Sequence, residues 1–160
     1  MADATAPAGG GSAFPATIRT ATPADLDGIM VIERANFPDD AWSRETMASE
    51  LVNPNGRYLV ALDGHEVIAY AGLRAAGDQA DVQTIAVRAD RRRGGIGRAL
   101  LLELLDEARR RGAESVFLEV RADNAPAQTL YAGLGFIAFT IRSGYYPGGV
   151  DAVVMQKVLS

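Results

Sequence analysis

"RRRGGIGRALL", residues 91–101, joins a predicted strand to a predicted amphipathic helix and decides the fold. The first N–H groups of a helix lack backbone partners and carry the positive end of its dipole, so they attract anions. Glycine lets that backbone approach a ligand closely. The positive charge of the arginines opposes the same dipole, which reduces stability by roughly 0.3–1 kcal/mol for each exposed arginine. A bound polyphosphate makes the contribution of these arginines favourable, so the stretch predicts a phosphate-binding turn. The alternative is a basic turn that is exposed to solvent and binds no ligand.

The composition is typical of one globular domain. The chain has 160 residues, of which 48% are hydrophobic and 22% charged, and its net charge of −4 argues against a nucleic-acid partner. It has no cysteine and one histidine, His65, which excludes thiolate nucleophiles and a His-based zinc site, so no metal is expected. Residues 1–15 lack the pattern of a signal peptide, and no apolar run is long enough to span a membrane. We therefore expect a cytoplasmic protein without a membrane partner, with a disordered tail at 1–15 and one domain at 16–160.

Hydrophobic periodicity predicts the order strand, helix, helix, three strands, helix, strand, helix, two strands. Thr22 and Pro23 are typical of a helix start, and Asp63-Gly64 is typical of a hairpin turn. The predicted strands are 16–22, the hairpin 57–76, 80–87, 115–120, 136–146 and 151–159, and the predicted helices are 24–37, a short one after Ser43, 96–111 and 124–135. This order predicts a mixed α/β sheet with helices on both faces.

Two common phosphate-binding motifs do not fit the glycine-rich turn. A Walker loop requires Lys and then Ser or Thr after its last glycine, whereas Arg98 and Ala99 follow Gly97. A dinucleotide-binding fingerprint requires a small residue where Leu100 stands, and no acidic residue closes the next strand as that fingerprint requires. The turn therefore predicts a different kind of phosphate ligand.

The stretch "RRGGIG" resembles the Q/R-x-x-G-x-G/A motif of the GCN5-related N-acetyltransferases (GNAT). The likeness continues in "TIAV", "LEVRADNAPAQTLYAGLGF" and "IRSGYYP", and together these look like the RimI-type N-terminal alanine acetyltransferases. It covers about residues 16–158, and the block from Leu118 to Phe136 is its most specific part. One departure stands before the last strand, where Val150-Asp151 replaces the usual acidic pair and leaves the finer substrate preference open.

The resemblance implies a GNAT fold, with a mostly antiparallel twisted sheet, a parallel splayed pair of strands and helices on both faces. It also implies acetyl-CoA as cosubstrate, with its pyrophosphate on the glycine-rich turn. The cofactor-binding residues that it implies are Ile85, Ala86, Val87, Arg92, Arg93, Gly94, Gly95, Ile96, Gly97, Arg98 and Asn124. Asn124 is also expected to cap the helix that follows it.

Glu119 interrupts an otherwise apolar strand, Val116 to Val120. A buried carboxylate needs a partner or has a raised pKa, and a raised pKa suits a general base near neutral pH. Pairing with Arg121 or exposure to solvent is the alternative. The resemblance implies that Glu119 is the base.

Tyr131 lies on a predicted helix, where an aromatic side chain often packs in the core. A phenol with a pKa of about 10 can also protonate a leaving thiolate whose conjugate acid has a pKa of about 8.5. The resemblance implies this role for Tyr131. Because the chain has no cysteine, direct attack of an amine on acetyl-CoA remains the simple route.

The sequence therefore predicts an acetyl-CoA-dependent transferase that acts on the α-amino group of a protein N-terminus, in the RimI manner on a ribosomal protein. By resemblance, Tyr145 and Tyr146 contact the first residues of that substrate. An acetyltransferase of lysine side chains or small amines is one alternative. A non-catalytic module that senses acyl-CoA is another, against which the presence of both Glu119 and Tyr131 argues.

Overall fold

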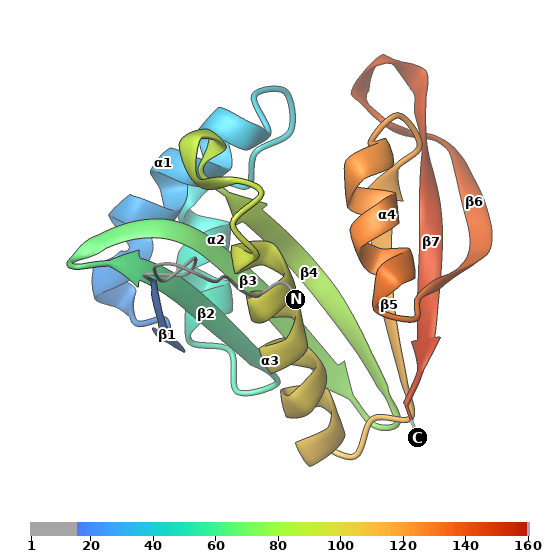
Figure 1. Cartoon of the computed structure of the whole chain (residues 1–160), viewed down its shortest axis with the longest axis horizontal. Helices are drawn as coiled ribbons and strands as arrows, with labels where there is room; N and C mark the ends of the chain where they lie inside the picture. Colours follow the sequence, from blue (N-terminus) through green and yellow to red (C-terminus); the bar gives the residue numbers. More distant parts are fainter. Residues whose placement is uncertain (1–15, 160) are drawn as a thin grey trace.

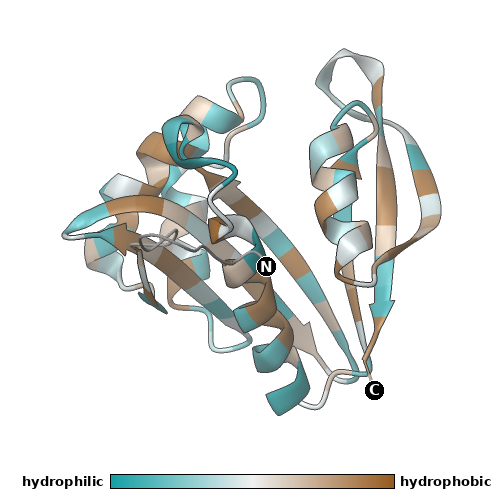
Figure 2. Cartoon of the chain, viewed as in Figure 1, coloured by the Kyte–Doolittle hydropathy of each residue, from teal (hydrophilic) through white to brown (hydrophobic). Residues whose placement is uncertain are grey.

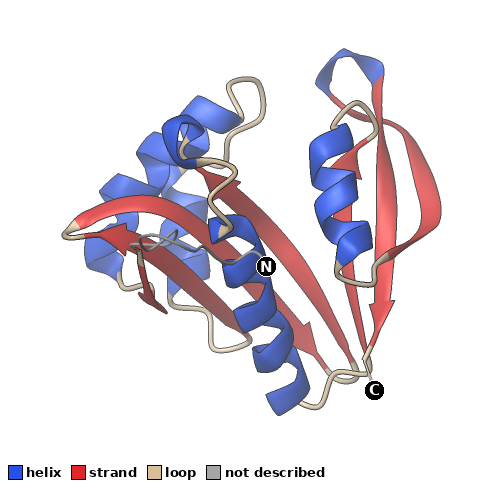
Figure 3. Ribbon diagram, viewed as in Figure 1, coloured by secondary structure: helices blue, strands red, loops and turns tan. Residues whose placement is uncertain are grey.

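The computed structural model describes residues 16–159, so the tail predicted at residues 1–15 lies outside the described part. One seven-stranded sheet has the order β1-β2-β3-β4-β5-β7-β6 and is flanked by helices (Figures 1 and 3). The strands are β1 (Thr17–Thr20), β2 (Gly56–Asp63), β3 (Glu66–Ala76), β4 (Gln79–Val87), β5 (Ser115–Arg121), β6 (Ile137–Tyr146) and β7 (Val150–Val158). The α-helices are α1 (Leu26–Asn36), α2 (Arg44–Leu51), α3 (Ile96–Arg110) and α4 (Ala125–Gly133), and three short 3-10 segments span Pro23–Asp25, Ala89–Arg91 and Pro147–Gly149.

The helices cover the two faces of the sheet unequally. One hydrophobic cluster packs α3 and α4 against β2 to β5 and β7 and includes Leu100, Leu104 and Tyr131. A second cluster packs α1 and α2 against β2, β3 and Ala86 of β4, without any residue of β5, β6 or β7. The central strands carry the hydrophobic segments seen in brown in Figure 2. Among the described residues, β5 and β7 are thus covered by a helix on one face only, and β6 is exposed along nearly its whole length.

The sheet opens between its two central strands. β4 and β5 are parallel and pair only from Gln79 to Asp81 with Ser115 to Phe117, after which they diverge (Figure 1). Every other neighbouring pair of strands is antiparallel. The predicted fold is therefore confirmed: a mixed, mostly antiparallel sheet with a splayed parallel pair and helices on both faces.

Two local details differ from the sequence prediction. The helix after Thr22 begins with a 3-10 turn, in which the Thr22 backbone N–H donates to Asp25 at 2.8 Å. The loop of the β2–β3 hairpin is Gly64-His65, because Asp63 already pairs with Glu66. No helix within residues 16–159 is long and apolar enough to cross a bilayer.

Candidate active site

The glycine-rich turn links the end of β4 to the start of α3. Gly95 is the N-cap residue with φ of 84°, and Arg93 also has a positive φ, of 67°. A left-handed residue beside the helix start turns several N–H groups toward one side, which is an arrangement that binds anions. The predicted turn is therefore present, with left-handed backbone at Arg93 and Gly95.

The four arginines of this turn fall into two pairs. Arg91 forms an ion pair with Asp63 at 2.7 Å, and Arg92 donates to the Val87 carbonyl at 3.1 Å and to the side-chain oxygen of Asn36. Arg93 and Arg98, in contrast, form no ion pair with any of residues 16–159. These two cations remain available for a ligand at a helix end that already carries positive charge.

The glycine-rich turn lies next to the opening in the sheet. A Cβ added to Gly97 would lie 3.7 Å from Val87 at the end of β4 and 3.8 Å from Leu130 of α4. From Val82 to Val87, β4 pairs with β3 on one side and has no strand of the described chain on the other. The backbone of Ile85, Ala86 and Val87 can thus pair with an extended ligand that enters between β4 and β5.

Two predicted residues belong to α4 and its N-cap, and α4 lies beside the opening, since its Leu130 approaches Gly97. Asn124 accepts from the Ala127 N–H at 3.2 Å, which confirms the predicted cap. Tyr131 is buried, and its ring packs edge-on against Phe136 with centroids 6.1 Å apart. Burial, with a smaller contribution from Tyr146, raises the pKa of Tyr131 to about 12. The phenol therefore keeps its proton at neutral pH, as a proton donor must.

Glu119 lies on the other face of β5. Side chains alternate along a strand, and Val116, Leu118 and Val120 point into the cluster that contains Tyr131. Glu119 therefore points to the face that has no helix over it, where its Oε2 forms an ion pair with Nε of Arg142 at 2.8 Å. The alternative pairing with Arg121 is wrong, because Arg121 donates to Asp123 at 3.0 Å.

Tyr145 and Tyr146 end β6 beside this carboxylate. Their rings meet edge-on at 5.1 Å, and the guanidinium of Arg121 lies 5.2 Å from the centre of the Tyr146 ring. Burial raises the pKa of Tyr145, and a hydrogen bond to Glu119 adds to this effect. Burial and the nearby charge of Glu119 also raise the pKa of Tyr146 to about 12. Both tyrosines are thus neutral near pH 7 and adjacent to Glu119.

The predicted residues therefore form two groups on opposite faces of the opened sheet. The turn that starts α3 and Tyr131 lie on the side of α3 and α4, and Glu119 and Tyr145 lie on the uncovered side. The end of β4 lies in the sheet between them, with Ala86 packed toward α1. Arg142 was not predicted from the sequence, although it contacts Glu119 across 23 positions of the chain. Its position in "IRSGYY" carried no signal of this contact, because the pairing depends on the register of β6 on β7.

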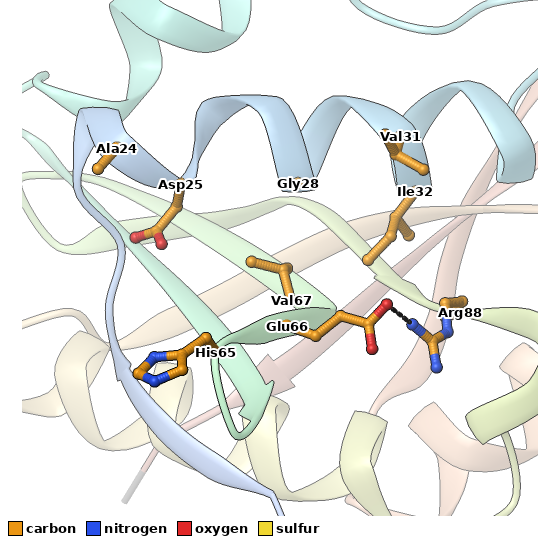
Figure 4. Close-up of a pocket in the computed structure, with 9 residues that line it drawn as sticks. All are labelled: Ala24, Asp25, Gly28, Val31, Ile32, His65, Glu66, Val67 and Arg88. Carbon is orange, nitrogen blue, oxygen red and sulfur yellow. Dashed lines mark ion pairs between the residues drawn. The ribbon is translucent and has the colours of Figure 1, made fainter.

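A separate pocket, of about 330 Å³, lies at the β2–β3 turn and α1 (Figure 4). It contains none of the predicted site residues. Its charged groups are already paired: Glu66 with Arg88 at 2.7 Å and Asp25 with Arg19 at 2.8 Å. His65 lines this pocket rather than the opening between β4 and β5.

Comparison with known proteins agrees with this geometry. Residues 26–136 match the acetyltransferase (GNAT) family. The chain is 42% identical to the [ribosomal protein bS18]-alanine N-acetyltransferase of Escherichia coli K12, over 90% of this chain and 98% of that protein. It is 38% identical to an uncharacterized Mycobacterium leprae protein, but spans only 41% of that relative's length.

The fold also matches a solved structure. The crystal structure of the ribosomal-protein-S18-alanine N-acetyltransferase from Escherichia coli superposes with a TM-score of 0.83 at 37% identity, covering 91% of this chain and 94% of that one. A match to the family over more than half of the chain, together with this extent of identity, leaves one assignment. The chain belongs to the GNAT family of acetyltransferases.

Proposed function

We propose that this protein transfers the acetyl group of acetyl-CoA to the α-amino group of a protein N-terminus, with the N-terminal alanine of a ribosomal protein as the acceptor. The observation that carries the proposal is the arrangement of Tyr131 and Glu119 on opposite faces of the opening between β4 and β5. Residues 16–160 would form the single catalytic domain, and a ribosomal acceptor implies that the enzyme works in the cytoplasm. The names of the Escherichia coli relatives support the choice of acceptor.

The cosubstrate would lie along the face of α3 and α4. Backbone N–H groups from Gly94 to Gly97, with Arg93 and Arg98, suit a pyrophosphate, because two unpaired cations and a helix start converge there. The unpaired edge of β4 from Ile85 to Val87 suits the pantetheine amides, and Asn124 can contact the same arm. The backbone there can also polarise the thioester carbonyl.

The reaction would then proceed by direct attack. The neutral amine nitrogen forms a bond to the thioester carbonyl carbon, and the carbon–sulfur bond of the resulting tetrahedral species breaks. Glu119, acting directly or through a water molecule, accepts a proton from the amine, and Tyr131 gives its proton to the departing sulfur. Because the base and the acid lie on opposite faces of the sheet, amine and thiol can enter and leave from opposite sides.

Amine acidity favours an N-terminus over lysine. An α-amino group has a pKa of about 7.7–8.0 and a lysine side chain about 10.4, so presenting the neutral amine at pH 7 requires roughly 1.2 and 4.6 kcal/mol respectively. A single carboxylate base can more easily supply the smaller of these two free energies, which is that of the α-amine. We expect peptides that carry both a free N-terminal alanine and an internal lysine to be acetylated at the N-terminus, as located by mass spectrometry at pH 7. Predominant lysine modification would overturn this acceptor while keeping the acetyltransferase activity.

The two catalytic assignments can be tested separately. Tyr131→Phe keeps the ring in the core, so it should bind acetyl-CoA nearly as well and lose roughly 10²–10⁴-fold in kcat, the span typical of general acid catalysis. Glu119→Gln should lower kcat/KM most at neutral pH, with a loss that shrinks at alkaline pH as the amine deprotonates unaided. Wild-type turnover by the first variant, or a loss in the second that does not depend on pH, would remove the corresponding role.

A further inference from the structure

Arg142 makes only partial use of its guanidinium within the protein. Its Nε pairs with Glu119, and its central carbon lies 5.5 Å from the centre of the Tyr145 ring. Glu119 is the only carboxylate among residues 16–159 that pairs with this arginine. The side chain is 57% exposed, and no side-chain hydrogen bond joins either terminal nitrogen to any of residues 16–159. Arg142 thus combines a fixed position beside the base with free hydrogen-bond donors.

Arg121 lies on the same face and offers a contrast. Its Nε and one terminal nitrogen both donate to Asp123, at 3.0 and 3.2 Å. Its guanidinium covers Tyr146 rather than Glu119. The planar fork of Arg121 is therefore already occupied by a carboxylate, whereas the fork of Arg142 is not.

The chemistry of the acceptor indicates what Arg142 can bind. In a peptide N-terminus the amine nitrogen and the first carbonyl oxygen are joined through two carbon atoms, so they lie about 3 Å apart. An amine held at Glu119 thereby brings this carbonyl close to the arginine that pairs with the same carboxylate. In a lysine side chain, the four carbons nearest the amine are methylenes that accept no hydrogen bond.

We propose that Arg142 is a specificity-determining residue: its terminal nitrogens donate to the first carbonyl oxygen of the acceptor and so distinguish an α-amine from a lysine ε-amine. This inference rests on the proposed function and adds a residue that reads the acceptor. Asp81 on β4 and Tyr145 and Tyr146 on β6 also surround Glu119. Of these three side chains, the carboxylate accepts only, and each tyrosine offers a single hydroxyl donor instead of a fork.

The test compares kcat/KM for two peptides, one with a free N-terminal alanine and one blocked at its N-terminus with an internal lysine. Arg142→Gln removes the charge and the fork, whereas Arg142→Lys keeps the charge alone. Both variants should lose about tenfold or more on the α-amine peptide, mainly through KM, with a smaller change on the lysine peptide. Arg109→Gln, on the exposed surface of α3, is the matched control and should leave the ratio of the two values unchanged.

A double-substitution cycle isolates the contact itself. A peptide whose first carbonyl oxygen is replaced by sulfur has a weaker acceptor at the same position and carries no new charge. Wild-type enzyme should discriminate against this peptide, and Arg142→Gln should do so much less, because the partner of that oxygen is gone. Thermal unfolding of each variant checks that folding is intact.

Three results separate the possible outcomes. Equal losses on both amines in the Arg142 variants, or additive effects in the cycle, would overturn the role of Arg142 while the α-amine activity of the wild type stands. Wild-type enzyme that modifies lysine alone would overturn the proposed function, and this role with it. A selective loss on the α-amine together with coupling to the carbonyl oxygen is the expected result.

Discussion

Both ends of α3 are rich in arginine, but only at the carboxyl end does every arginine pair with a carboxylate. At the carboxyl end, Arg109 pairs with Asp106 at 3.2 Å, and Arg110 and Arg111 pair with Glu107 at 2.8 and 2.7 Å. Cations there also suit the negative end of the helix dipole. At the amino end, Arg93 and Arg98 pair with no carboxylate of residues 16–159, and they oppose the dipole. The difference teaches that arginine content alone does not distinguish the two ends of the helix, whereas the pairing of each charge does.

The carboxyl end of α3 also connects distant parts of the chain. Glu107 accepts from Arg57 of β2 at 2.9 Å, and Arg111 donates to the carbonyls of Pro54 and Gly56. Burial alone would raise the pKa of Glu107, but the hydrogen bonds from its three arginines outweigh it and lower the pKa to about 2. This end of the helix therefore contributes to stability, whereas the other end is free to serve a ligand.

The largest expected effect comes from reversing the charge at the amino end. Arg93→Glu with Arg98→Glu should raise KM for acetyl-CoA by about a hundredfold or more, because two charged hydrogen bonds of roughly 1.5–3 kcal/mol each are lost and repulsion is added. The midpoint of thermal unfolding should not fall, because acidic residues suit this end of the dipole. Steady-state kinetics and calorimetry measure the two quantities.

The matched reversal is made at the other end of the same helix. Arg110→Glu with Arg111→Glu should lower the unfolding midpoint and leave KM for acetyl-CoA within about twofold, since these residues lie a helix length of roughly 20 Å from the turn. If both double variants changed KM alike, the effect would be one of net charge, and the distinction between the two ends would be lost.

A smaller effect is expected from Glu107→Gln. Removing this carboxylate leaves three arginines without their partner and should reduce the free energy of unfolding by about 1–3 kcal/mol, less than for a fully buried pair because the arginines remain hydrated. KM for acetyl-CoA should not change. Chemical denaturation of wild type and variant at pH 7 gives the difference.

The same carboxylate predicts a pH dependence. Its pKa in the folded protein, about 2, is below the ordinary value of 4.5, so its contribution is complete above about pH 4.5 and is lost as the pH falls toward 2. The difference in stability between wild type and Glu107→Gln should therefore shrink over this range. If this difference in stability stayed constant down to pH 2, it would arise from packing of the side chain and not from its charge.

The smallest effect compares one glycine at each end of α3. Gly95 and Gly112 have nearly equal φ values, 84° and 86°, so alanine at either position should reduce stability by about 1–2 kcal/mol. Only Gly95→Ala should also raise KM for acetyl-CoA, because its backbone belongs to the phosphate turn. Equal kinetics for the two variants would indicate that the turn does not approach the ligand.

Much of the fold was predictable because the signals are local. The period of the apolar residues in α3 and the alternation in β5 follow from which side chains one face of each element buries. The cap at Asn124 and the left-handed Gly95 likewise depend on neighbours only a few positions away. The hairpin turn was displaced by one residue, since register there depends on how Asp63 pairs with Glu66 across the strands.

The candidate site was predictable only in part. Its residues were found from local motifs and a family resemblance, and the structure brings Glu119, Tyr145 and Tyr146 together. The partner of Glu119 was not found. A charged residue in an apolar strand indicates that a partner is needed, but the sequence does not identify that partner. Whether Glu119 pairs with Arg121 or Arg142 depends on the register of β5 on β7 and of β6 on β7.

The sequence by itself determined the order of the elements, the glycine-rich turn before α3 and the kinds of titratable side chain present, because these depend on the residues themselves and on contacts between near neighbours. Only the tertiary structure decided that β4 and β5 separate after three pairs, that Tyr131 and Glu119 lie on opposite faces, and that Arg93 and Arg98 remain uncompensated. These features arise from packing and charge pairing between segments far apart in the chain, and a local sequence pattern does not indicate which distant segment a residue contacts.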